Sequence, residues 1–220
     1  GELDGRAVAV RRTARSVESL EWELDLVDRL DAGGFLVPEV IATSDGRPHA
    51  DGIVVQRWID GDPPTTADDW SAVASELQRL HVLFAGHPQR PGCVTVSELV
   101  AARRSGDADL DAIPQPERST LERLLETFGD VRVSVIHGDP GPSNLRITPD
   151  GRVGLLDWDE SRVDVVWHDL SELGVPVLHA EQQRRAAILS DVWEAANGWV
   201  AEPEYARRRF ESLLRRVSGG

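Results

Sequence analysis

One short turn constrains the fold of this chain more than any other stretch. The tetrapeptide Thr148-Pro149-Asp150-Gly151 is flanked by two short apolar segments, LRI before it and VGLL after it. Pro149 suits the first corner of a type I turn, and Gly151 can supply the left-handed residue that follows such a turn. We therefore predict a β-hairpin over residues 145–156.

The predicted hairpin brings two polar side chains to the same end. Asn144 lies just before the first strand and Asp157 just after the second, equally far from the centre of the turn. An antiparallel hairpin places such positions side by side, roughly 5 Å apart at the backbone. The amide oxygen of Asn144 and the carboxylate of Asp157 could then hold one hard cation. Oxygen ligands of this kind suit Mg²⁺.

A third acid lies in the loop before the hairpin. The segment VRVSVI, residues 131–136, is predicted to be a buried strand, and Asp139 follows it in a loop rich in Gly and Pro. Loops held by rigid strands commonly carry catalytic groups. The order Asp139, then Asn144, then Asp157 matches the catalytic base and the metal ligands of the phosphoryl-transfer template.

The remaining pattern predicts strands early in the chain and helices later. We expect strands in GRAVAVRRT, VPEVIAT and GIVVQRWIDG, and a helix in SVESLEWELDLVDRLDA that ends at Gly33 and Gly34. Further helices are expected from about Ala67, near 95–104, near 116–128, and over most of the chain after Asp169.

These elements predict an α+β fold in two parts. A small strand-rich domain should cover residues 1–62, and a larger, mainly helical domain should cover residues 63–220. Clefts between two such domains are common ligand sites.

Composition and charge exclude several classes of protein. The 220 residues are 40% apolar, which argues against disorder, and no apolar run reaches the length of a membrane span. A net charge of −14 disfavours a nucleic-acid partner and would weakly attract a cationic ligand. The single cysteine, Cys93, excludes an internal disulfide, and a free thiol fits the reducing cytoplasm. All 24 basic residues are Arg, so any role that usually falls to Lys must fall to Arg.

The segments HGDPGPSN, LLDWDE and WHDL resemble the aminoglycoside phosphotransferase and choline kinase-like family, a relative of the protein kinases. The resemblance implies a two-lobed protein-kinase-like fold, here with a truncated small β-rich N-lobe and a larger helical C-lobe. It also implies transfer of the γ-phosphate of ATP to a small-molecule hydroxyl. On this basis Asp139 is the catalytic base, and Asn144 and Asp157 are the magnesium ligands.

The resemblance assigns supporting roles to other residues of these segments. His137 is expected to be a structural loop residue, as is His81 in LQRLH. Asp159 is a candidate to assist the metal or to shape the pocket. Asp169 resembles the family's helix-start Asp that supports the catalytic loop.

The resemblance extends to the N-terminal strands. AVAVRR is similar to the strand whose basic residue meets the nucleotide phosphates, and Arg11 is the candidate in this Lys-free chain. Its acidic partner is expected on the next helix, where Glu23 fits best by spacing and Glu18 and Glu21 remain rivals.

VVQRWIDG resembles the strand and hinge that contact adenine through backbone groups, which assigns these contacts to Arg57 and Ile59. The family normally begins with two strands and a phosphate-covering loop, whereas only GELDG precedes the strand that carries Arg11. Either an N-terminal segment is missing from this sequence, or the protein works without that lid.

The leading hypothesis is an ATP- and Mg²⁺-dependent phosphotransferase whose acceptor is an aminoglycoside or another cationic hydroxylated compound. Its pocket should lie between the Asp139 loop and the C-terminal helices, with Glu160 and Asp164 as candidate acids. A catalytically impaired, kinase-like binding or regulatory module is the first alternative. A metallohydrolase that uses His137, Asp139 and Asp157 is the second. Neither a nucleic acid nor a membrane is an expected partner, and the sequence favours no oligomeric state.

Overall fold

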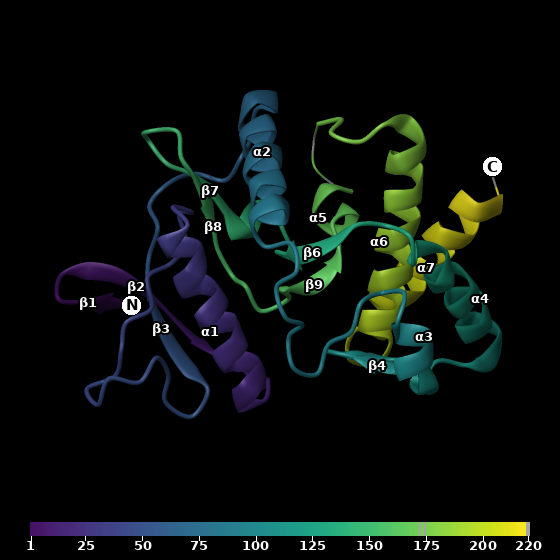
Figure 1. Cartoon of the computed structure of the whole chain (residues 1–220), viewed down its shortest axis with the longest axis horizontal. Coiled ribbons are helices and arrows are strands. Elements are labelled where there is room, and N and C mark those ends of the chain that lie inside the picture. The colour runs from purple at the N-terminus through teal and green to yellow at the C-terminus, as the bar shows by residue number, and fades with distance from the viewer. Residues whose placement is uncertain (172, 174, 219–220) are drawn as a thin grey trace. The chain divides into compact units, whose positions relative to one another are not determined.

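The computed structural model describes residues 1–171, 173 and 175–218. The chain divides into two units. The first comprises Gly1–Glu76 and His137–Ser161, and the second comprises Leu77–Ile136 and Arg162–Gly220. The first boundary falls inside helix α2 (Ala67–Leu83), which therefore belongs to both units. Figure 1 labels the elements of each unit.

The first unit contains a three-stranded antiparallel sheet, helix α1, the first part of α2 and a separate hairpin. Its elements are β1 (Glu2–Leu3), β2 (Arg6–Arg12), α1 (Val17–Ala32), β3 (Ile53–Arg57), β7 (Leu145–Ile147) and β8 (Val153–Leu155). The sheet order is β1-β2-β3. Asp4 and Gly5, with φ of 51° and 73°, join β1 to β2 in a two-residue turn whose left-handed backbone matches the strand twist.

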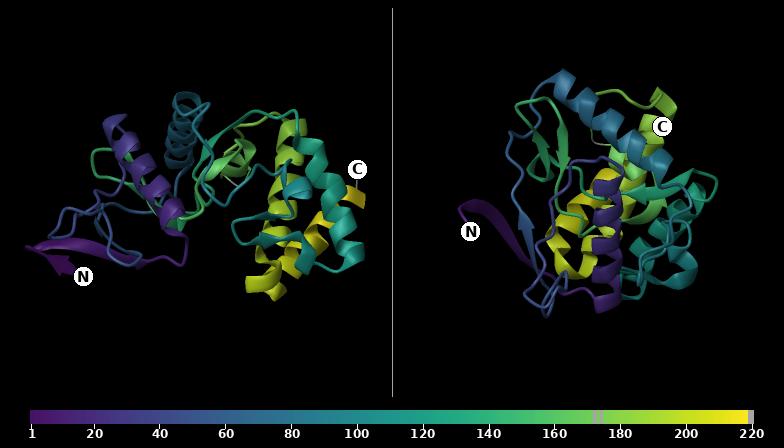
Figure 2. Two further views of the ribbon diagram at one scale, coloured as in Figure 1. Left: turned by 60° about the horizontal axis from the view of Figure 1, so that its bottom comes forward. Right: turned by 60° about the vertical axis from the view of Figure 1, so that its left-hand side comes forward.

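Helix α1 forms where the sequence predicts it. The side chain of Ser16 caps its first turn by accepting a hydrogen bond from the N–H of Ser19 at 3.3 Å. The N–H of Gly33 donates to the carbonyl of Arg29 at 2.9 Å and ends the helix. Leu20 and Leu24 are buried in a cluster with Val54 of β3. The helix and the strand therefore form one layer on another, as Figure 2 shows.

One predicted strand is absent. VPEVIAT contributes only an isolated bridge between Val40 and Gln56, with hydrogen bonds from Ile41 to Val55 and from Arg57 to Glu39. The pairing of this segment with β3 does not extend to Pro38.

The hairpin β7–β8 is attached to its own unit on both edges. Ile147 of β7 exchanges two backbone hydrogen bonds with Asp62, at 2.7 and 3.1 Å, and Leu155 of β8 donates to the carbonyl of Leu36 at 2.9 Å. A Cβ at Gly61 would lie only 2.6 Å from the carbonyl oxygen of Ile147, so the close approach requires glycine there. The contact of Leu155 with Leu36 holds the open end of the hairpin, where Asn144 and Asp157 lie.

The second unit is mainly helical and contains two small two-stranded sheets, β4–β5 and β6–β9. Its further elements are α3 (Leu99–Ala102), β4 (Arg104–Ser105), β5 (Ala108–Asp109), α4 (Gln115–Leu125), β6 (Val133–Ile136), β9 (Arg162–Val165), α5 (Trp167–Leu170), α6 (Ala180–Ala201) and α7 (Pro203–Ser218). Short 3₁₀ turns cover Leu110–Ala112 and Glu126–Phe128. Its core includes an apolar cluster that contains Leu121, Leu189, Val192 and Leu213.

Several predictions in this unit are confirmed and others are wrong. The helix near 116–128, the buried strand near 131–136 and the helical C-terminal region are confirmed; Gly219, Gly220 and positions 172 and 174 lie outside the described residues. The helix expected near 95–104 is reduced to the single turn of α3, because the left-handed Arg103 (φ 68°) ends it. Strand β9 was not predicted.

Within the described residues, no helix combines the length and the apolar character that crossing a bilayer demands.

Candidate active site

The turn predicted at the tip of the hairpin is present. The N–H of Gly151 donates to the carbonyl of Thr148 at 2.8 Å, the N–H of Thr148 donates to the carbonyl of Arg152 at 3.0 Å, and Gly151 has a φ of 81°. Strands β7 and β8 flank this turn, which confirms the hairpin over residues 145–156.

The register of the hairpin differs by one residue from the prediction. The N–H of Leu156, rather than that of Asp157, lies opposite Asn144 and donates to its carbonyl at 2.9 Å. Gly151 adds one residue to the second side of the turn, as a bulge does, and the assumption of equal spacing ignored it. Asp157 consequently lies one residue beyond Leu156, the residue that pairs with Asn144.

The backbone of Asp157 departs from strand geometry at this offset. A shift of one residue along a regular strand would turn the side chain to the opposite face. Asp157 instead has a left-handed backbone, with a φ of 53°, which interrupts the alternation at this point. Such a conformation costs a non-glycine residue roughly 1–3 kcal/mol and is found where a site needs it. The Asp157 carboxylate is exposed and makes no hydrogen bond or ion pair with any other described residue.

Asp139 and Asn144 are in direct contact. The amide nitrogen of Asn144 donates to the Oδ2 atom of Asp139 at 2.8 Å and to the Asp139 carbonyl at 3.1 Å. These bonds orient the amide so that its oxygen is turned away from Asp139. The Pro142–Asn144 3₁₀ turn closes the loop between the two residues, since the Asn144 N–H donates to the carbonyl of Gly141 at 2.9 Å.

The two residues before Asp139 lock its loop onto the segment that carries Asp157. His137 is fully buried, and its Nε2 atom lies 2.7 Å from the Leu156 carbonyl, while its ring packs on Trp158 with centroids 4.7 Å apart. At Gly138, with a φ of 91°, a Cβ would lie 2.4 Å from the carbonyl oxygen of Glu160. His137 is therefore a structural residue, and only glycine fits at Gly138.

Arg11 of β2 and Glu23 of α1 form an ion pair. The Glu23 side chain is 1% exposed and that of Arg11 is 20% exposed, so this pair is largely removed from water. The rival acids Glu18 and Glu21 are both exposed, and neither contacts Arg11.

Arg11 also contacts the loop beyond the hairpin. Its Nη1 atom donates to the Oδ1 atom of Asp159 at 3.0 Å. Arg15, which the sequence analysis overlooked, donates to Glu160 at 2.7 Å and to Asp159 at 3.5 Å. The hydroxyl of Thr13 accepts a hydrogen bond from the Arg15 N–H at 3.1 Å. The segment RRTAR (residues 11–15) therefore binds both acids of the WDE segment (residues 158–160). In the sequence, only a group of arginines at the end of a strand indicates this contact.

Of the two residues expected to contact adenine, Arg57 ends β3 and Ile59 follows two residues later. The backbone N–H of Arg57 donates to the Glu39 carbonyl at 2.8 Å, so only its carbonyl remains for a ligand, and its guanidinium lies 3.7 Å from the Glu39 carboxylate. Ile59 is buried and packs against Gly154, where an added Cβ would lie 3.1 Å from the Ile59 side chain. The Ile59 N–H donates to no other described residue.

Asp164, proposed from the sequence as a pocket acid, is fully buried in the second unit. It accepts hydrogen bonds from the Val96 N–H at 2.8 Å and from the Arg162 guanidinium at 2.9 Å. Burial raises its pKa, but the charges of Arg162 and His168 outweigh that effect, and the net pKa falls to about 2. A carboxylate engaged in this way is not open to an acceptor molecule, so the expectation for Asp164 is wrong. The other candidate, Glu160, is partly exposed and bound to Arg15.

Asp169 and His81 are paired in the core of the second unit. The Nε2 atom of His81 lies 2.8 Å from the Oδ2 atom of Asp169, and both side chains are almost completely buried. The His81 carbonyl in turn accepts from Arg132 at 2.6 Å. The structural character expected for both residues fits this contact, which joins α2 to α5.

Comparison with known proteins decides the family. No curated protein matches the chain. The model of the phosphotransferase enzyme family matches residues 2–210. The chain belongs to this family.

Solved structures show which fold the phosphotransferase adopts. Choline kinase LicA from Streptococcus pneumoniae aligns over 100% of this chain and 88% of its own, with 16% identity and a TM-score of 0.70. The microcompartment-associated aminopropanol kinase aligns over 95% of this chain and 82% of its own, with 18% identity and a TM-score of 0.61. The enzyme of the gentamicin-APH(2")-IIa complex aligns over 98% and 84%, with 16% identity and a TM-score of 0.60. The phosphotransferase therefore has a mixed helix–strand, protein-kinase-like fold.

The residues of the phosphotransferase offer a suitable donor set for a hard cation. The amide oxygen of Asn144 is turned away from Asp139, and the Asp157 carboxylate is exposed and unbonded among the described residues. Mg²⁺ prefers such oxygen ligands and commonly takes only one or two from the protein. In the described part of the chain, no three His, Cys, Asp or Glu side chains gather in a way that could hold a metal.

Proposed function

We propose that this phosphotransferase uses ATP and Mg²⁺ to phosphorylate a hydroxyl group of a small molecule. The observation that carries the proposal is the hydrogen bond between Asn144 and Asp139 at one end of the hairpin, with Asp157 one residue past the opposite strand position. This arrangement supports a site in which Asp139 would accept a proton beside oxygen atoms that would bind a cation.

The roles follow from the chemistry of each side chain. Asn144 and Asp157 would hold Mg²⁺, which neutralises phosphate charge when it is bound. Arg11 would bind phosphate oxygens with its guanidinium, which Glu23 holds from the side of α1. Asp139 would orient the acceptor hydroxyl and take its proton. A bond then forms between the acceptor oxygen and the γ-phosphorus, the bond to the bridging oxygen breaks, and ADP leaves.

The adenine contacts proposed for the hinge are consistent with its backbone. Ile59 offers an N–H that donates to no other described residue, and Arg57 offers its carbonyl, because its own N–H is engaged by Glu39. An amide donor and a carbonyl acceptor two residues apart can pair with one edge of a purine. Related folds have been solved with AMP, ADP and ATP bound, which supports nucleotide use.

We propose a hydroxylated amine as the acceptor, with an aminoglycoside as the leading candidate. The net charge of −14 favours a cation. The neighbouring folds are named for choline, aminopropanol, gentamicin and streptomycin, all of which combine an amine with hydroxyl groups. Fold similarity is weak support for a substrate, so this part of the proposal depends mainly on chemistry.

Two expectations from the sequence belong to the same proposal. Residues 1–62 would be the small nucleotide-binding lobe and residues 63–220 the larger lobe. The enzyme would act in the cytoplasm, where ATP is abundant and a free thiol such as Cys93 persists.

The proposal is tested by ATP consumption with a panel of amino alcohols and aminoglycosides. Wild-type protein should form ADP only with an acceptor present, and Asp139→Asn should lose at least about a hundredfold in kcat, the size of a typical general-base contribution. Asp150→Asn, at the tip of the hairpin, is the matched control and should keep wild-type activity. Equal ADP formation by wild type and Asp139→Asn would refute the assignment.

The catalytically impaired module remains a second candidate because of one observation. In this Lys-free chain the phosphate-facing position falls to Arg11, whose guanidinium is already engaged by Glu23 and Asp159. A module of this kind would bind Mg-ATP or a small ligand without turnover. Binding of Mg-ATP with no product for any acceptor would favour it over the enzyme.

A further inference from the structure

A groove with an apolar floor lies on the outer side of α1, within the first unit. Its volume is about 440 Å³, and it runs between α1 and the segment 38–48. The apolar residues that line it are Leu24, Val27, Pro38, Val40, Ala42 and Pro48. This volume lies in the range of ligand-binding clefts, roughly 300–1,000 Å³.

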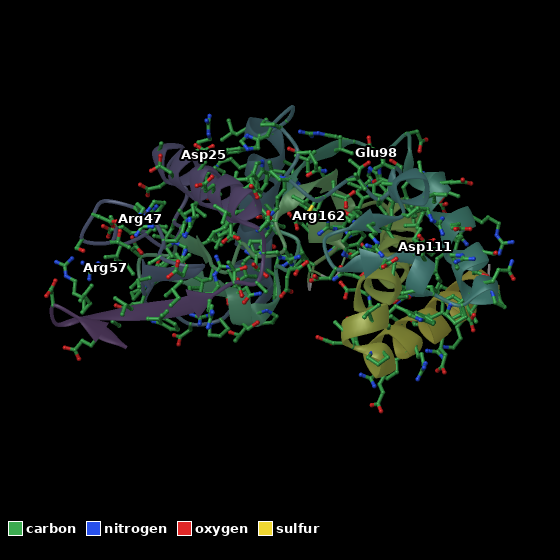
Figure 3. The ribbon with its side chains drawn as sticks, turned by 90° about the horizontal axis from the view of Figure 1, so that it is seen from below. Asp25, Arg47, Arg57, Glu98, Asp111 and Arg162 are labelled. Atoms are coloured by element: carbon green, nitrogen blue, oxygen red, sulfur yellow. The ribbon has the colours of Figure 1, made fainter. Side chains whose placement is uncertain are left out.

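Carboxylates line both walls of this groove. Glu21, Asp25, Asp28 and Asp31 stand along α1, Glu39 stands on the opposite wall, and all five residues are exposed. The lining contains no basic residue. Figure 3 labels Asp25 on α1 and Arg47 on the 38–48 segment.

Most of this negative charge is not neutralised within the protein. Asp25 pairs with Arg29 at 2.6 Å, and Glu39 lies 3.7 Å from Arg57. The side chains of Glu21, Asp28 and Asp31 make no ion pair or hydrogen bond with other described residues. Arg47, close by in sequence, is occupied by Asp45 at 2.8 Å.

The carboxylates of α1 form a row of defined length. Their spacing of three or four residues puts them on one helical face, where each like-charged pair costs about 0.2–0.5 kcal/mol. From Glu21 to Asp31 the row extends over about 15 Å, at ~1.5 Å per residue. Glu23, which serves Arg11, is buried on another face of the same helix, so the groove is distinct from the proposed phosphate site.

We infer that this groove docks a basic amphipathic helix of a partner protein. The apolar floor accepts bulky aliphatic side chains, and the two acidic walls accept Lys or Arg on either side of them. A row of about 15 Å matches about ten residues of a helix, longer than a compact small molecule. Helices that lie in apolar grooves use anchors with this same spacing of three and four residues.

The test uses a fluorescein-labelled, helix-stapled peptide of fourteen residues, with two leucines one turn apart and four flanking arginines. Three comparisons accompany it: a peptide of the same composition in scrambled order, spermine as a competitor with charge but no apolar anchor, and a titration with NaCl. Binding is measured by fluorescence anisotropy on the full chain. The designed peptide should bind, and binding should weaken with salt.

Two kinds of variant separate charge from shape. Glu21→Gln/Asp28→Asn/Asp31→Asn removes the unpaired carboxylates and should weaken binding about tenfold, as expected for three exposed ion pairs. Ala42→Trp fills the groove without changing its charge and should abolish peptide binding. The matched control Glu2→Gln/Glu126→Gln/Glu211→Gln removes three exposed acids elsewhere and should leave binding unchanged.

Circular dichroism of each variant must first show wild-type helix content. The inference is overturned if the designed peptide does not bind wild type, or if the scrambled peptide or spermine binds equally well. It is also overturned if Ala42→Trp binds normally or if both triple variants lose affinity equally. None of these outcomes depends on phosphotransferase activity.

Discussion

Replacing Arg11 by Met should destabilise the protein mainly through Glu23. The Glu23 side chain is 1% exposed, whereas that of Asp159, the other acid bound to Arg11, is 34% exposed. Removing one partner of a buried ion pair costs about 3–5 kcal/mol, because the remaining charge is left without compensation. Losing an exposed pair costs only about 0.2–1 kcal/mol. Since Arg11 is itself 20% exposed, we expect the low end, about 3 kcal/mol.

A second substitution tests where this cost arises. Glu23→Leu removes the buried carboxylate that Arg11→Met leaves without a partner. Replacing a buried ion pair by an apolar pair commonly costs little free energy of unfolding. Arg11→Met/Glu23→Leu should therefore recover about 2 kcal/mol relative to Arg11→Met. Arg11→Met/Asp159→Asn is the matched control and should recover almost nothing.

The assay is urea unfolding at pH 7, followed by the fluorescence of the seven Trp residues. All three Arg11 variants should also lose phosphoryl transfer, because recovery of stability does not restore a phosphate-binding cation. The reasoning is refuted if Glu23→Leu gives no recovery, or if Asp159→Asn gives the same recovery as Glu23→Leu.

Three further predictions concern other contacts of the fold and site. Gly138→Ala should lower both kcat and the urea midpoint of unfolding, since the added Cβ would lie 2.4 Å from the carbonyl oxygen of Glu160. Equal kcat values for the variant and wild type would contradict this. Asp159→Asn should tighten nucleotide binding up to about fivefold, as measured by calorimetry, because the Asp159 carboxylate competes with phosphate for Arg11. Weaker binding by the variant would contradict this and would mean that Asp159 contributes to nucleotide binding. The pKa of Asp164 falls from 3.8 in the unfolded chain to about 2 in the folded protein. Its contribution of about 2 kcal/mol to the free energy of unfolding is therefore present above pH 4 and is lost toward pH 2. Acid unfolding of Asp164→Asn should lack this pH-dependent loss of stability, and parallel unfolding curves for the variant and wild type would refute the prediction.

Local sequence signals were sufficient to predict the hairpin and helix α1. The turn residues Pro149 and Gly151 and the caps Ser16 and Gly33 act over a few positions, so their effects are visible in the sequence. The segment VPEVIAT shows the limit of prediction from apolar patterning. Its β-branched residues predicted a strand, but the segment forms only one bridge to β3.

Contacts between distant segments could not be predicted in the same way. The bulge at Gly151 shifts the register by one residue, and the backbone of Asp157 turns left-handed just beyond the paired positions. The contact of Arg15 with Glu160 joins residues 145 positions apart through long side chains. Asp164 was taken for a pocket acid because burial at that position depends on β9, a strand that was not predicted.

The central claim is that Asn144 and Asp157 together bind the magnesium that accompanies ATP. Calorimetric titration with ATP, with and without MgCl₂, tests this claim most directly in wild type, Asn144→Ala and Asp157→Asn. Mg²⁺ should tighten ATP binding to wild type, and each variant should lose that increment while keeping its affinity for ATP alone. A magnesium-dependent increment that persists undiminished in both variants would contradict the account.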